Sequence, residues 1–428
     1  MEKFREFLKE EGLPGNERRK IITIPLNVTY DFGKKLKILR PKRKSSDGKE
    51  YDFKKDAPVP IIGDIPDYLT HNTVVSDWYP RIQAVQSRGT ALVTLKDKVS
   101  LRDQHLVLLN YDTLFFELEQ FKRERSWYNF NISKEGIYKL LKNPTWYTLY
   151  LPAAKLNPTN FDGVLLLQQV AIELLKRYCD HYYNYRKRAY IEPRLELREL
   201  TKDDDNIPQE KFYQLIVDGD EEQVIQGIQQ IKKDLEQNKD ALLKAGDLNA
   251  CKFGKHLFQP LFHVRRGGKI TILPVALNES EYQFIKDLKA WCDDHKTDLE
   301  KEDTELFLLR NMSRGKGVGF FEAGNFHPDF ILWMLVGGKQ YVTFIEPHGL
   351  LHEGPGSEKI LFHKRIKDVE HRLNDSNVIL NSFILSWTQY PQLKWDNTQE
   401  DLENRNVLFM TDDRDGYIDK LFARLQGI

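Results

Sequence analysis

Residues 328–349 read PDFILWMLVGGKQYVTFIEPHG, and this stretch carries the clearest structural pattern in the sequence. Two runs of apolar, β-branched and aromatic residues flank the pair Gly337-Gly338, a combination typical of two antiparallel strands joined by a tight turn. Centring the hairpin on the two glycines places Asp329 opposite Glu346. Directly opposed like charges destabilise a strand pair, and a divalent metal is the common reason for keeping them. The sequence therefore predicts that Asp329 and Glu346 hold a metal, with Mg²⁺ the ion that suits hard oxygen ligands.

The segments around this hairpin extend it into a larger unit. Strands are predicted at 317–323, 328–335, 339–349 and 377–387, and helices at 279–295, 298–311 and 357–374. The predicted order is therefore helix, three strands, helix and strand. We expect an α/β (α+β) protein with an αβββαβ core at its C-terminal end.

The preceding part of the chain is predicted to be mainly helical. Helical patterns cover the ranges 103–122, 133–143, 162–190 and 220–245, a strand is predicted at 20–30, and 256–278 is expected to form a hairpin. The proline-containing stretch 41–67 indicates an irregular connection. We expect a basic N-terminal segment with an irregular linker over 1–70, a mainly helical connecting or DNA-guiding domain over 71–249, and the αβββαβ domain over 250–428.

Composition excludes several classes of protein. The 428 residues are 40% hydrophobic and 30% charged, the balance of a globular protein rather than a disordered or membrane-embedded one. No run approaches the ~20 apolar residues that a spanning helix needs, and the N-terminus has no apolar signal-peptide region. Cys179, Cys251 and Cys292 lie far apart, which argues against a disulfide framework or a structural zinc site. We expect a cytoplasmic protein.

The 64 basic and 64 acidic side chains cancel, but they are unevenly distributed. Residues 1–60 carry 16 basic and 10 acidic side chains. The basic cluster consists of Lys34, Lys35, Lys37, Arg40, Lys42, Arg43 and Lys44. Such a cluster can neutralise phosphates, and it is equally typical of a solvated linker.

A second basic group lies at the end of the helix predicted over 162–190. There Arg186, Lys187 and Arg188 follow several tyrosines. Aromatic and cationic side chains together can bind single-stranded nucleic acid by stacking and charge. The same pattern is also typical of a helix end whose long side chains cover apolar surface.

The motif Pro328-Asp329 followed by Glu346-Pro347-His348 resembles the signature of the PD-(D/E)xK nuclease superfamily. In that superfamily, Pro-Asp and a later Asp/Glu-x-Lys are embedded in an αβββαβ core. The resemblance implies a restriction-endonuclease-like fold and hydrolysis of DNA phosphodiester bonds with Mg²⁺ or Mn²⁺ bound by the two carboxylates. Water is the attacking group, so no Ser or Cys nucleophile is implied.

The resemblance also directs attention to further side chains. An acidic residue on the helix before the strands often completes the superfamily's site, and Glu305 is the first candidate here, with Glu322 on the expected first strand as the second. His348 stands where the superfamily has lysine, and a histidine can donate a hydrogen bond or act as a base near neutral pH. Lys339 or Lys364 could supply the missing cation.

Further stretches are similar to the C-terminal part of DEAD/DEAH-box helicase-nucleases such as the restriction subunit of type III restriction enzymes. These stretches are 74–89, 126–152, 256–262, 273–284 and 308–334. The sequence contains neither a GxxxxGK[ST] motif nor a DEAD/DEAH motif. We therefore expect the region after the motor, as a subunit or a fragment, without ATPase activity. The implied partners are DNA, a helicase motor and a methylase or specificity subunit, in restriction or anti-phage defence.

Two alternatives remain open at this point. The histidine at position 348 also suits a nuclease-like fold that has lost activity and serves as a DNA-binding or assembly platform. RNA could replace DNA as the substrate, because nothing in the motif distinguishes them.

Overall fold

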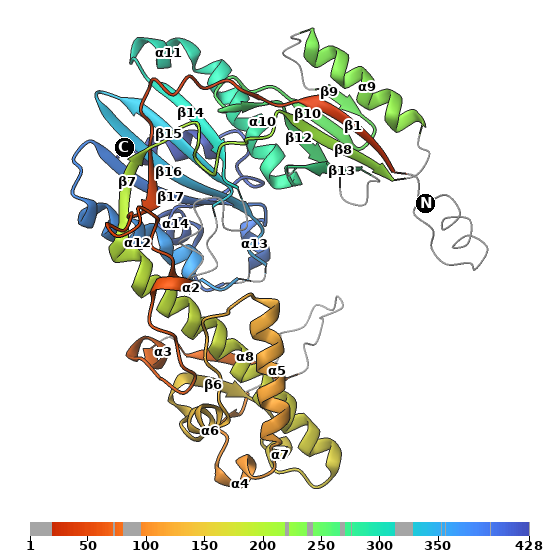
Figure 1. Ribbon diagram of the computed structural model, residues 1–428, viewed down its shortest axis with the longest axis vertical. Coiled ribbons are helices and arrows are strands. Elements are labelled where there is room, and N and C mark those ends of the chain that lie inside the picture. Colours follow the sequence, from red (N-terminus) through yellow and green to blue (C-terminus); the bar gives the residue numbers. More distant parts are fainter. Residues whose placement is uncertain are drawn as a thin grey trace. The chain divides into compact units, whose positions relative to one another are not determined.

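The computed structural model describes residues 19–71, 73–79, 96–218, 222–237, 243–265, 270–274, 276–312, 328–351, 353–355, 357–393 and 395–427. Helices and several small sheets alternate along the chain, so the protein has a mixed α/β fold (Figure 1). Two compact units are present: unit 1 comprises 1–40, 196–321 and 325–428, and unit 2 comprises 41–195 and 322–324. These bounds differ from the three consecutive parts expected from the sequence, because unit 2 is inserted into unit 1.

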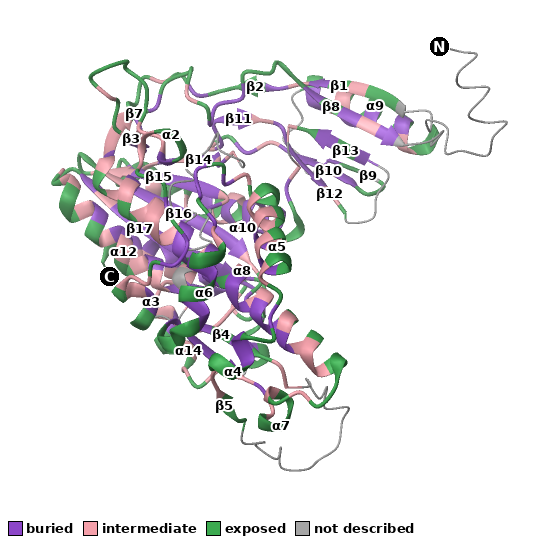
Figure 2. Cartoon of the chain, turned by 60° about the horizontal axis from the view of Figure 1, so that its bottom comes forward, coloured by how far each residue is buried: buried purple, intermediate pink, exposed green. Residues whose placement is uncertain are grey.

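A five-stranded sheet forms the centre of unit 1. Its strands, in spatial order, are β14 (Glu305–Arg310), β15 (Phe330–Val336), β16 (Lys339–His348), β17 (Val378–Ser386) and β18 (Val407–Phe409). The first three pair antiparallel, whereas β16–β17 and β17–β18 are parallel. Figure 2 shows the middle strands as largely buried, which explains their nearly continuous apolar sequences.

The helices that contact this sheet include α10 (Glu279–Asp294), α12 (Glu358–Leu373), α14 (Gln399–Glu403) and α15 (Tyr417–Gln426). The short helices α11 (Lys296–Lys301) and α13 (Tyr390–Leu393) follow α10 and β17 along the chain. Helix α10 begins with a capping box between Asn278 and Glu281, and α12 begins at the N-cap Ser357. Along the chain the described elements follow in the order α10, α11, β14, β15, β16, α12 and β17.

One element of this order was predicted wrongly. A helix was expected over 298–311, but only 296–301 is helical and residues 305–310 form strand β14. The four consecutive apolar residues 306–309 fit a buried strand as well as a helix, and periodicity alone does not separate the two. The strand expected at 317–323 lies outside the described residues.

The remainder of unit 1 contains smaller sheets. One consists of β1 (Arg19–Pro25), β8 (Phe212–Asp218) and β13 (Ile270–Leu273), and another of β9 (Leu243–Ala245), β10 (Leu248–Cys251) and β12 (Leu261–Val264). Short pairs join β2 (Asn27–Val28) to β11 (Phe258–Gln259) and β3 (Lys37–Pro41) to β7 (Leu195–Glu199). Helix α9 (Glu222–Glu236) is shorter than the 220–245 expected, and β12 and β13 pair with β10 and β8 rather than as one hairpin.

Unit 2 is built around the long helix α8 (Phe161–Ile191), which agrees with the helix predicted at 162–190. Its other helices are α2 (Phe53–Asp56), α3 (Asp67–His71), α4 (Asp103–Leu106), α5 (Tyr111–Glu124), α6 (Lys134–Lys142) and α7 (Ala153–Leu156), with single 3₁₀ turns at Pro144–Trp146 and Glu192–Arg194. A small sheet contains β4 (Val74–Asp77), β6 (Tyr147–Tyr150) and β5 (Lys98–Val99). The single helix expected over 103–122 is interrupted between α4 and α5, where Asn110 caps the second helix.

Two general expectations can be compared with the described residues. Among them, no helix combines the length and the apolar character needed to cross a membrane. The three cysteines are buried and form no disulfide.

Candidate active site

Asp329 and Glu346 face each other across the β15–β16 hairpin. The register pairs Phe330 with Ile345 and Val336 with Lys339, so the residues one step further from the turn, Asp329 and Glu346, are opposed as the sequence predicted. Asn311 fixes the backbone just before β15, because its N–H donates to Asp329 O over 2.7 Å and its side-chain amide donates to Pro328 O over 2.8 Å. The hairpin thus places two carboxylates where β15 begins and β16 ends, within the sheet.

Glu346 is buried, with 5% of its surface exposed. The ammonium of Lys359 donates to its Oε1 over 2.9 Å, whereas its buried Oε2 has no hydrogen-bond partner among the described residues. Burial raises the pKa of Glu346 to about 7, against the lowering effect of Lys359. A buried carboxylate oxygen without a donor is costly, so Oε2 has the property expected of a ligand atom.

The cation beside Glu346 is Lys359, which is neither of the two lysines, Lys339 and Lys364, that the sequence suggested. It lies in the first turn of α12 and also contacts Glu353 at 3.4 Å. Burial lowers the pKa of Lys359, but the two glutamates outweigh this effect and the net pKa is raised. The side chain is therefore a protonated ammonium held beside Glu346.

A third carboxylate, Glu281, lies close enough to Asp329 for its charge to raise the pKa of Asp329. It is 3% exposed and accepts two hydrogen bonds from Arg310, from Nε at 3.2 Å and from Nη2 at 2.8 Å. It also accepts hydrogen bonds from the backbone and side-chain nitrogens of Asn278, at 3.1 and 2.8 Å, which complete the capping box of α10. Glu281 is thus oriented by both a helix cap and an arginine.

The backbone of Arg310 is held by a buried histidine. Arg310 N donates to His256 Nε2 over 2.9 Å, and Nδ1 of the same ring lies 2.7 Å from Phe258 O. Burial lowers the pKa of His256 to about 3, so the ring is neutral, with the proton on Nδ1. The site is therefore supported by a hydrogen-bonded set that extends away from the carboxylates.

Asp329 is the carboxylate without a cation of its own. It is partly exposed, and no described residue donates a hydrogen bond to its side chain. Burial raises its pKa, and the charges of Glu281 and Glu346 raise it further, whereas Arg310 and Lys359 act in the opposite direction. Four carboxylates, counting Glu353, share the two cations Arg310 and Lys359, and the raised pKa values of Asp329 and Glu346 reflect this crowding of acidic groups.

His348 lies two residues after Glu346 on β16. Burial lowers its pKa, and the charge of Lys359 lowers it further, so the ring is neutral near pH 7. Alternate residues of a strand share a face, so His348 is on the same face as Glu346, at the C-terminal end of β16.

The structure places the other predicted site residues elsewhere. Glu305 pairs with Leu335 at the turn end of the sheet, about 17 Å from the Arg310 end by the rise of a strand, and forms an ion pair with Lys34 at 2.7 Å. The prediction that Glu305 joins Asp329 and Glu346 is therefore wrong, because residue 305 begins a strand instead of lying on a helix. Glu322 lies outside the described residues.

Neither lysine considered as a substitute cation is near the carboxylates. Lys339 pairs with Val336 at the turn of the hairpin, and Lys364 is exposed on α12. Sequence reasoning missed Lys359, Glu281 and Arg310. The Asn278-x-x-Glu281 capping pattern was the only local signal, and it indicates a helix start rather than a site.

The basic residues between positions 34 and 44 are mostly paired with acids. Lys34 contacts Glu305 at 2.7 Å, Lys37 contacts Glu199 at 3.7 Å and Lys44 contacts Asp56 at 2.8 Å. Arg40 is buried and ion-pairs with Asp204. Lys35, Lys42 and Arg43 lie within or beside the β3 segment, with Arg43 bridged to Glu50 through the backbone. Much of this charge is therefore compensated within the protein.

The basic end of α8 is also packed. Three of its tyrosines, Tyr178, Tyr182 and Tyr183, are core residues rather than exposed platforms. Arg186 donates to Tyr182 Oη over 3.2 Å, and Arg188 lies over the ring of Tyr68 at 4.7 Å, with Lys187 between them in the sequence. This arrangement fits the alternative in which long side chains cover apolar surface.

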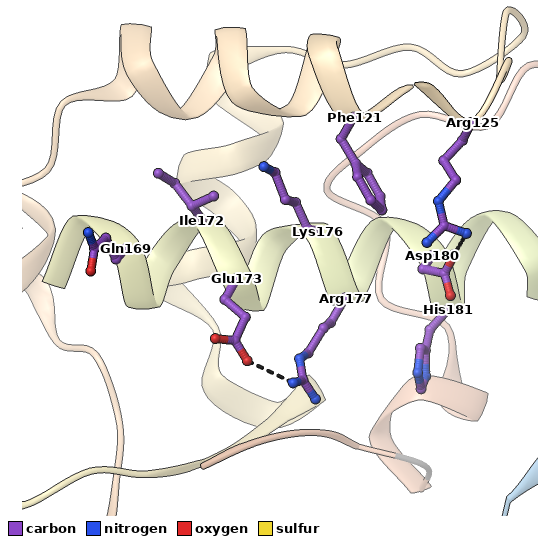
Figure 3. Close-up of a pocket in the computed structure, with 9 residues that line it drawn as sticks. All are labelled: Phe121, Arg125, Gln169, Ile172, Glu173, Lys176, Arg177, Asp180 and His181. Carbon is purple, nitrogen blue, oxygen red and sulfur yellow. Dashed lines mark ion pairs between the residues drawn. The ribbon is translucent and has the colours of Figure 1, made fainter. Parts of the chain in front are cut away.

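Unit 2 has a surface pocket of about 450 Å³ along α8 (Figure 3). Its lining residues are Phe121, Arg125, Gln169, Ile172, Glu173, Lys176, Arg177, Asp180 and His181. The dashed pairs in Figure 3 are Arg125 with Asp180 at 3.1 Å and Arg177 with Glu173 at 2.8 Å, and Lys176 contacts Glu117 at 2.7 Å. Because each of these three cations has a carboxylate partner, the pocket has no evident affinity for an anion.

Comparisons with models of protein families, with curated proteins and with solved structures found no match.

Proposed function

We propose that unit 1 is a Mg²⁺-dependent endonuclease domain of the PD-(D/E)xK type that hydrolyses DNA phosphodiester bonds. The observation that carries the proposal is the set formed by Asp329, Glu346 and Lys359: two opposed carboxylates on a hairpin, with a buried ammonium 2.9 Å from one of them. The order of helices and strands around the hairpin and the Pro328-Asp329 and Glu346-Pro347-His348 motifs support the same assignment.

The donor set fits a hard divalent cation. Glu346 Oε2 is buried without a donor, and Asp329 has no cation partner. Mg²⁺ needs only one or two carboxylates and completes its octahedron with water and phosphate oxygens. Asp329 and Glu346 would hold the ion, with Glu281 close by. When bound, such an ion neutralises charge on the scissile phosphate and lowers the pKa of a coordinated water.

The remaining side chains would position the substrate. The Lys359 ammonium keeps its proton and can donate to a phosphate oxygen or to the attacking water, the role that the superfamily assigns to its lysine. His348 is neutral and can accept a proton or orient water at the end of β16. Arg310 holds Glu281 and limits the negative charge at the phosphate.

The proposed nuclease domain would act together with partner subunits. Several stretches of the sequence resemble type III helicase-nucleases, namely 74–89, 126–152, 256–262, 273–284 and 308–334. This resemblance supports a partnership with a helicase motor and a methylase or specificity subunit in restriction or anti-phage defence. On this view the chain supplies the cleavage step and the motor supplies ATP-driven movement. RNA as the substrate remains the alternative to DNA.

A second candidate function is a catalytically inactive DNA-binding or assembly platform. It is favoured by two observations: among the described residues no three His, Cys, Asp or Glu side chains are arranged to hold a metal, and Lys359 already occupies one oxygen of Glu346. The position of His348 in place of the lysine points the same way.

Plasmid nicking separates the two functions. Supercoiled DNA is incubated with Mg²⁺ or Mn²⁺ and the wild type, Asp329→Ala or Glu305→Ala, with and without the motor subunit. Endonuclease activity predicts nicking by the wild type and by Glu305→Ala, whose carboxylate lies at the far end of β14, and none by Asp329→Ala. Equal traces with all three proteins would exclude the nuclease, and no cleavage even with the motor would favour the platform.

A further inference from the structure

Glu353 is a further carboxylate beside the candidate site, and it shares the ammonium of Lys359 with Glu346. Lys359 Nζ lies 2.9 Å from Glu346 Oε1 and 3.4 Å from Glu353 Oε1. Glu346 is buried, and the side chains of Lys359 and Glu353 are 10% and 22% exposed. The charge of Glu353 raises the pKa of Glu346 and that of Lys359. Lys359 therefore lies between two acceptors, one in the proposed metal site and one beside it.

The connection between β16 and α12 carries Glu353 and is tied down on both sides of it. Leu350 N donates to Thr388 Oγ1 over 2.9 Å, and Arg405 Nη1 donates to Pro355 O over 3.0 Å. Glu353 N itself donates to Leu350 O over 3.0 Å. The backbone at Glu353 is thus held in place, whereas the flexible four-carbon stem of a lysine allows its ammonium to move.

The ion pair between Lys359 and Glu346 competes with metal binding at Glu346. A divalent ion on this carboxylate would repel the ammonium that lies 2.9 Å from its Oε1. The ammonium cannot simply leave, because an enclosed charge without a partner is costly. Glu353 removes this difficulty. A small shift from 3.4 Å brings Lys359 Nζ within the usual hydrogen-bonding distance of Glu353, about 2.7–3.2 Å.

We propose that Glu353 is a positioning residue that accepts the Lys359 ammonium when a divalent cation binds, and so frees Glu346 Oε1 for that cation. The inference rests on the proposed metal site and names the exchange of partners that makes the site available. An ammonium has three N–H donors, so Lys359 held by Glu353 keeps two of them for a phosphate oxygen or the attacking water. Glu353 acts through Lys359 and contacts neither the metal nor the DNA.

Mn²⁺ binding to four proteins tests this exchange. Isothermal titration calorimetry at a pH above the pKa of about 7 of Glu346 gives the Kd of the wild type, Glu353→Gln, Lys359→Met and the double variant. Glu353→Gln should weaken binding about tenfold, because the ammonium then stays on Glu346 or loses a charge-assisted hydrogen bond. In the Lys359→Met background the same substitution should weaken binding by less than about twofold, since no ammonium has to move.

Glu403→Gln is the matched control. Lys420 lies between Glu403 at 3.1 Å and Asp413 at 2.9 Å, so this substitution also removes one of two carboxylates that share a lysine. Its Kd should equal that of the wild type. The double variant controls for folding, because it carries the same glutamine at position 353, and its retained Mn²⁺ binding would show that the glutamine is tolerated.

Three results would overturn the role of Glu353 alone. Equal Kd values for the wild type and Glu353→Gln would show that the ammonium needs no second acceptor. Equal losses from Glu353→Gln in both backgrounds would show that Glu353 acts by its charge and not through Lys359. Binding by the wild type but not by Lys359→Met would show that the ammonium does not compete with the metal. Absence of binding by both of these proteins would instead reject the proposed metal site, and the exchange with it.

Discussion

At the scale of single residues, the carboxylates of the site differ in how their charge is compensated. Glu281 is held by Arg310 and Glu346 by Lys359, whereas Asp329 has neither a cation nor a hydrogen-bond donor among the described residues. The free energy needed to bury each carboxylate depends on whether that carboxylate is protonated, because buried like charges repel. The free energy of unfolding should therefore respond to pH and to substitution at these positions.

Asp329→Asn is expected to stabilise the metal-free protein at alkaline pH. Burial and the neighbouring Glu281 and Glu346 raise the pKa of Asp329 from 3.8 to about 8, so the folded state binds its proton more tightly than the unfolded state. The stability from that proton is present below about pH 4 and is lost as the pH rises toward 8. The variant does not lose stability in this way, so its free energy of unfolding at pH 8 should exceed that of the wild type by at least about 1 kcal/mol.

The measurement is urea unfolding in EDTA at pH 5, 6, 7 and 8. The advantage of Asp329→Asn should grow steadily through this range, and Glu305→Gln, at an ion pair remote from the cluster, should show no such trend. A constant difference between Asp329→Asn and the wild type would contradict the raised pKa.

Lys359→Met is expected to destabilise the metal-free protein and to make it more responsive to metal. Removing one partner of a buried ion pair leaves the other charge uncompensated, at a cost of about 3 kcal/mol. A divalent ion at Glu346 would restore that compensation. Thermal unfolding should therefore show a lower Tm for the variant in EDTA and a larger Tm increase with Mn²⁺ than the wild type shows. If Mn²⁺ raised the Tm of the variant and of the wild type equally, Lys359 would not be part of the metal site.

Local sequence was sufficient for part of this site. Asp329 and Glu346 could be placed because two glycines define the centre of the hairpin, and alternation then fixes which residues face each other. Lys359 and Glu281 could not be placed, because α12 and α10 reach this part of the sheet only through tertiary packing. No fixed sequence spacing links residue 346 to residue 359 across a helix boundary.

At the scale of elements, the β15–β16 hairpin sets the geometry of the carboxylates. Its turn consists of Gly337 and Gly338 with φ of 58° and 75°, both in the left-handed region required by a type I′ turn. The turn thereby controls the register that aligns residue 329 with residue 346. The misassigned strand β14 has no such signal, since its apolar residues 306–309 are consecutive and lack a flanking turn motif.

Gly338→Ala tests the contribution of this turn. An L-residue in the left-handed region costs about 1–2 kcal/mol, and a side chain there meets no other atom within 4 Å, so the effect is conformational. The free energy of unfolding by urea should fall by that amount. Gly254→Ala is the control, because its surroundings are also open and its φ is not positive. Equal stability of both variants would show that the turn does not constrain the hairpin.

At the scale of the whole molecule, unit 2 is an insertion in unit 1. The chain leaves unit 1 at residue 40 and returns at 196, and β3 and β7 pair at that point. Lys42 N donates to Arg194 O over 2.7 Å, so the two ends of the insertion are adjacent. The sequence did not indicate this, because pairing between segments more than 150 residues apart leaves no local pattern.

Replacing residues 43–193 with a short Gly/Ser linker should leave unit 1 folded. The ends that the linker joins are neighbours, and closing a short loop costs little entropy. Far-ultraviolet circular dichroism and urea unfolding of the shortened chain should show a cooperative transition. Loss of that transition would mean that unit 1 depends on unit 2 for its stability.

Direct metal binding is the simplest test of whether Asp329 and Glu346 hold a divalent metal, because neither DNA nor a motor subunit is needed. Electron paramagnetic resonance of free Mn²⁺ is followed during titration with the wild type, Asp329→Asn, Glu346→Gln and Glu305→Gln. Binding by the wild type and Glu305→Gln, reduced at least about tenfold by either of the other substitutions, is the predicted result. Absence of binding, or equal binding by all four proteins, would show that these two carboxylates do not form a metal site.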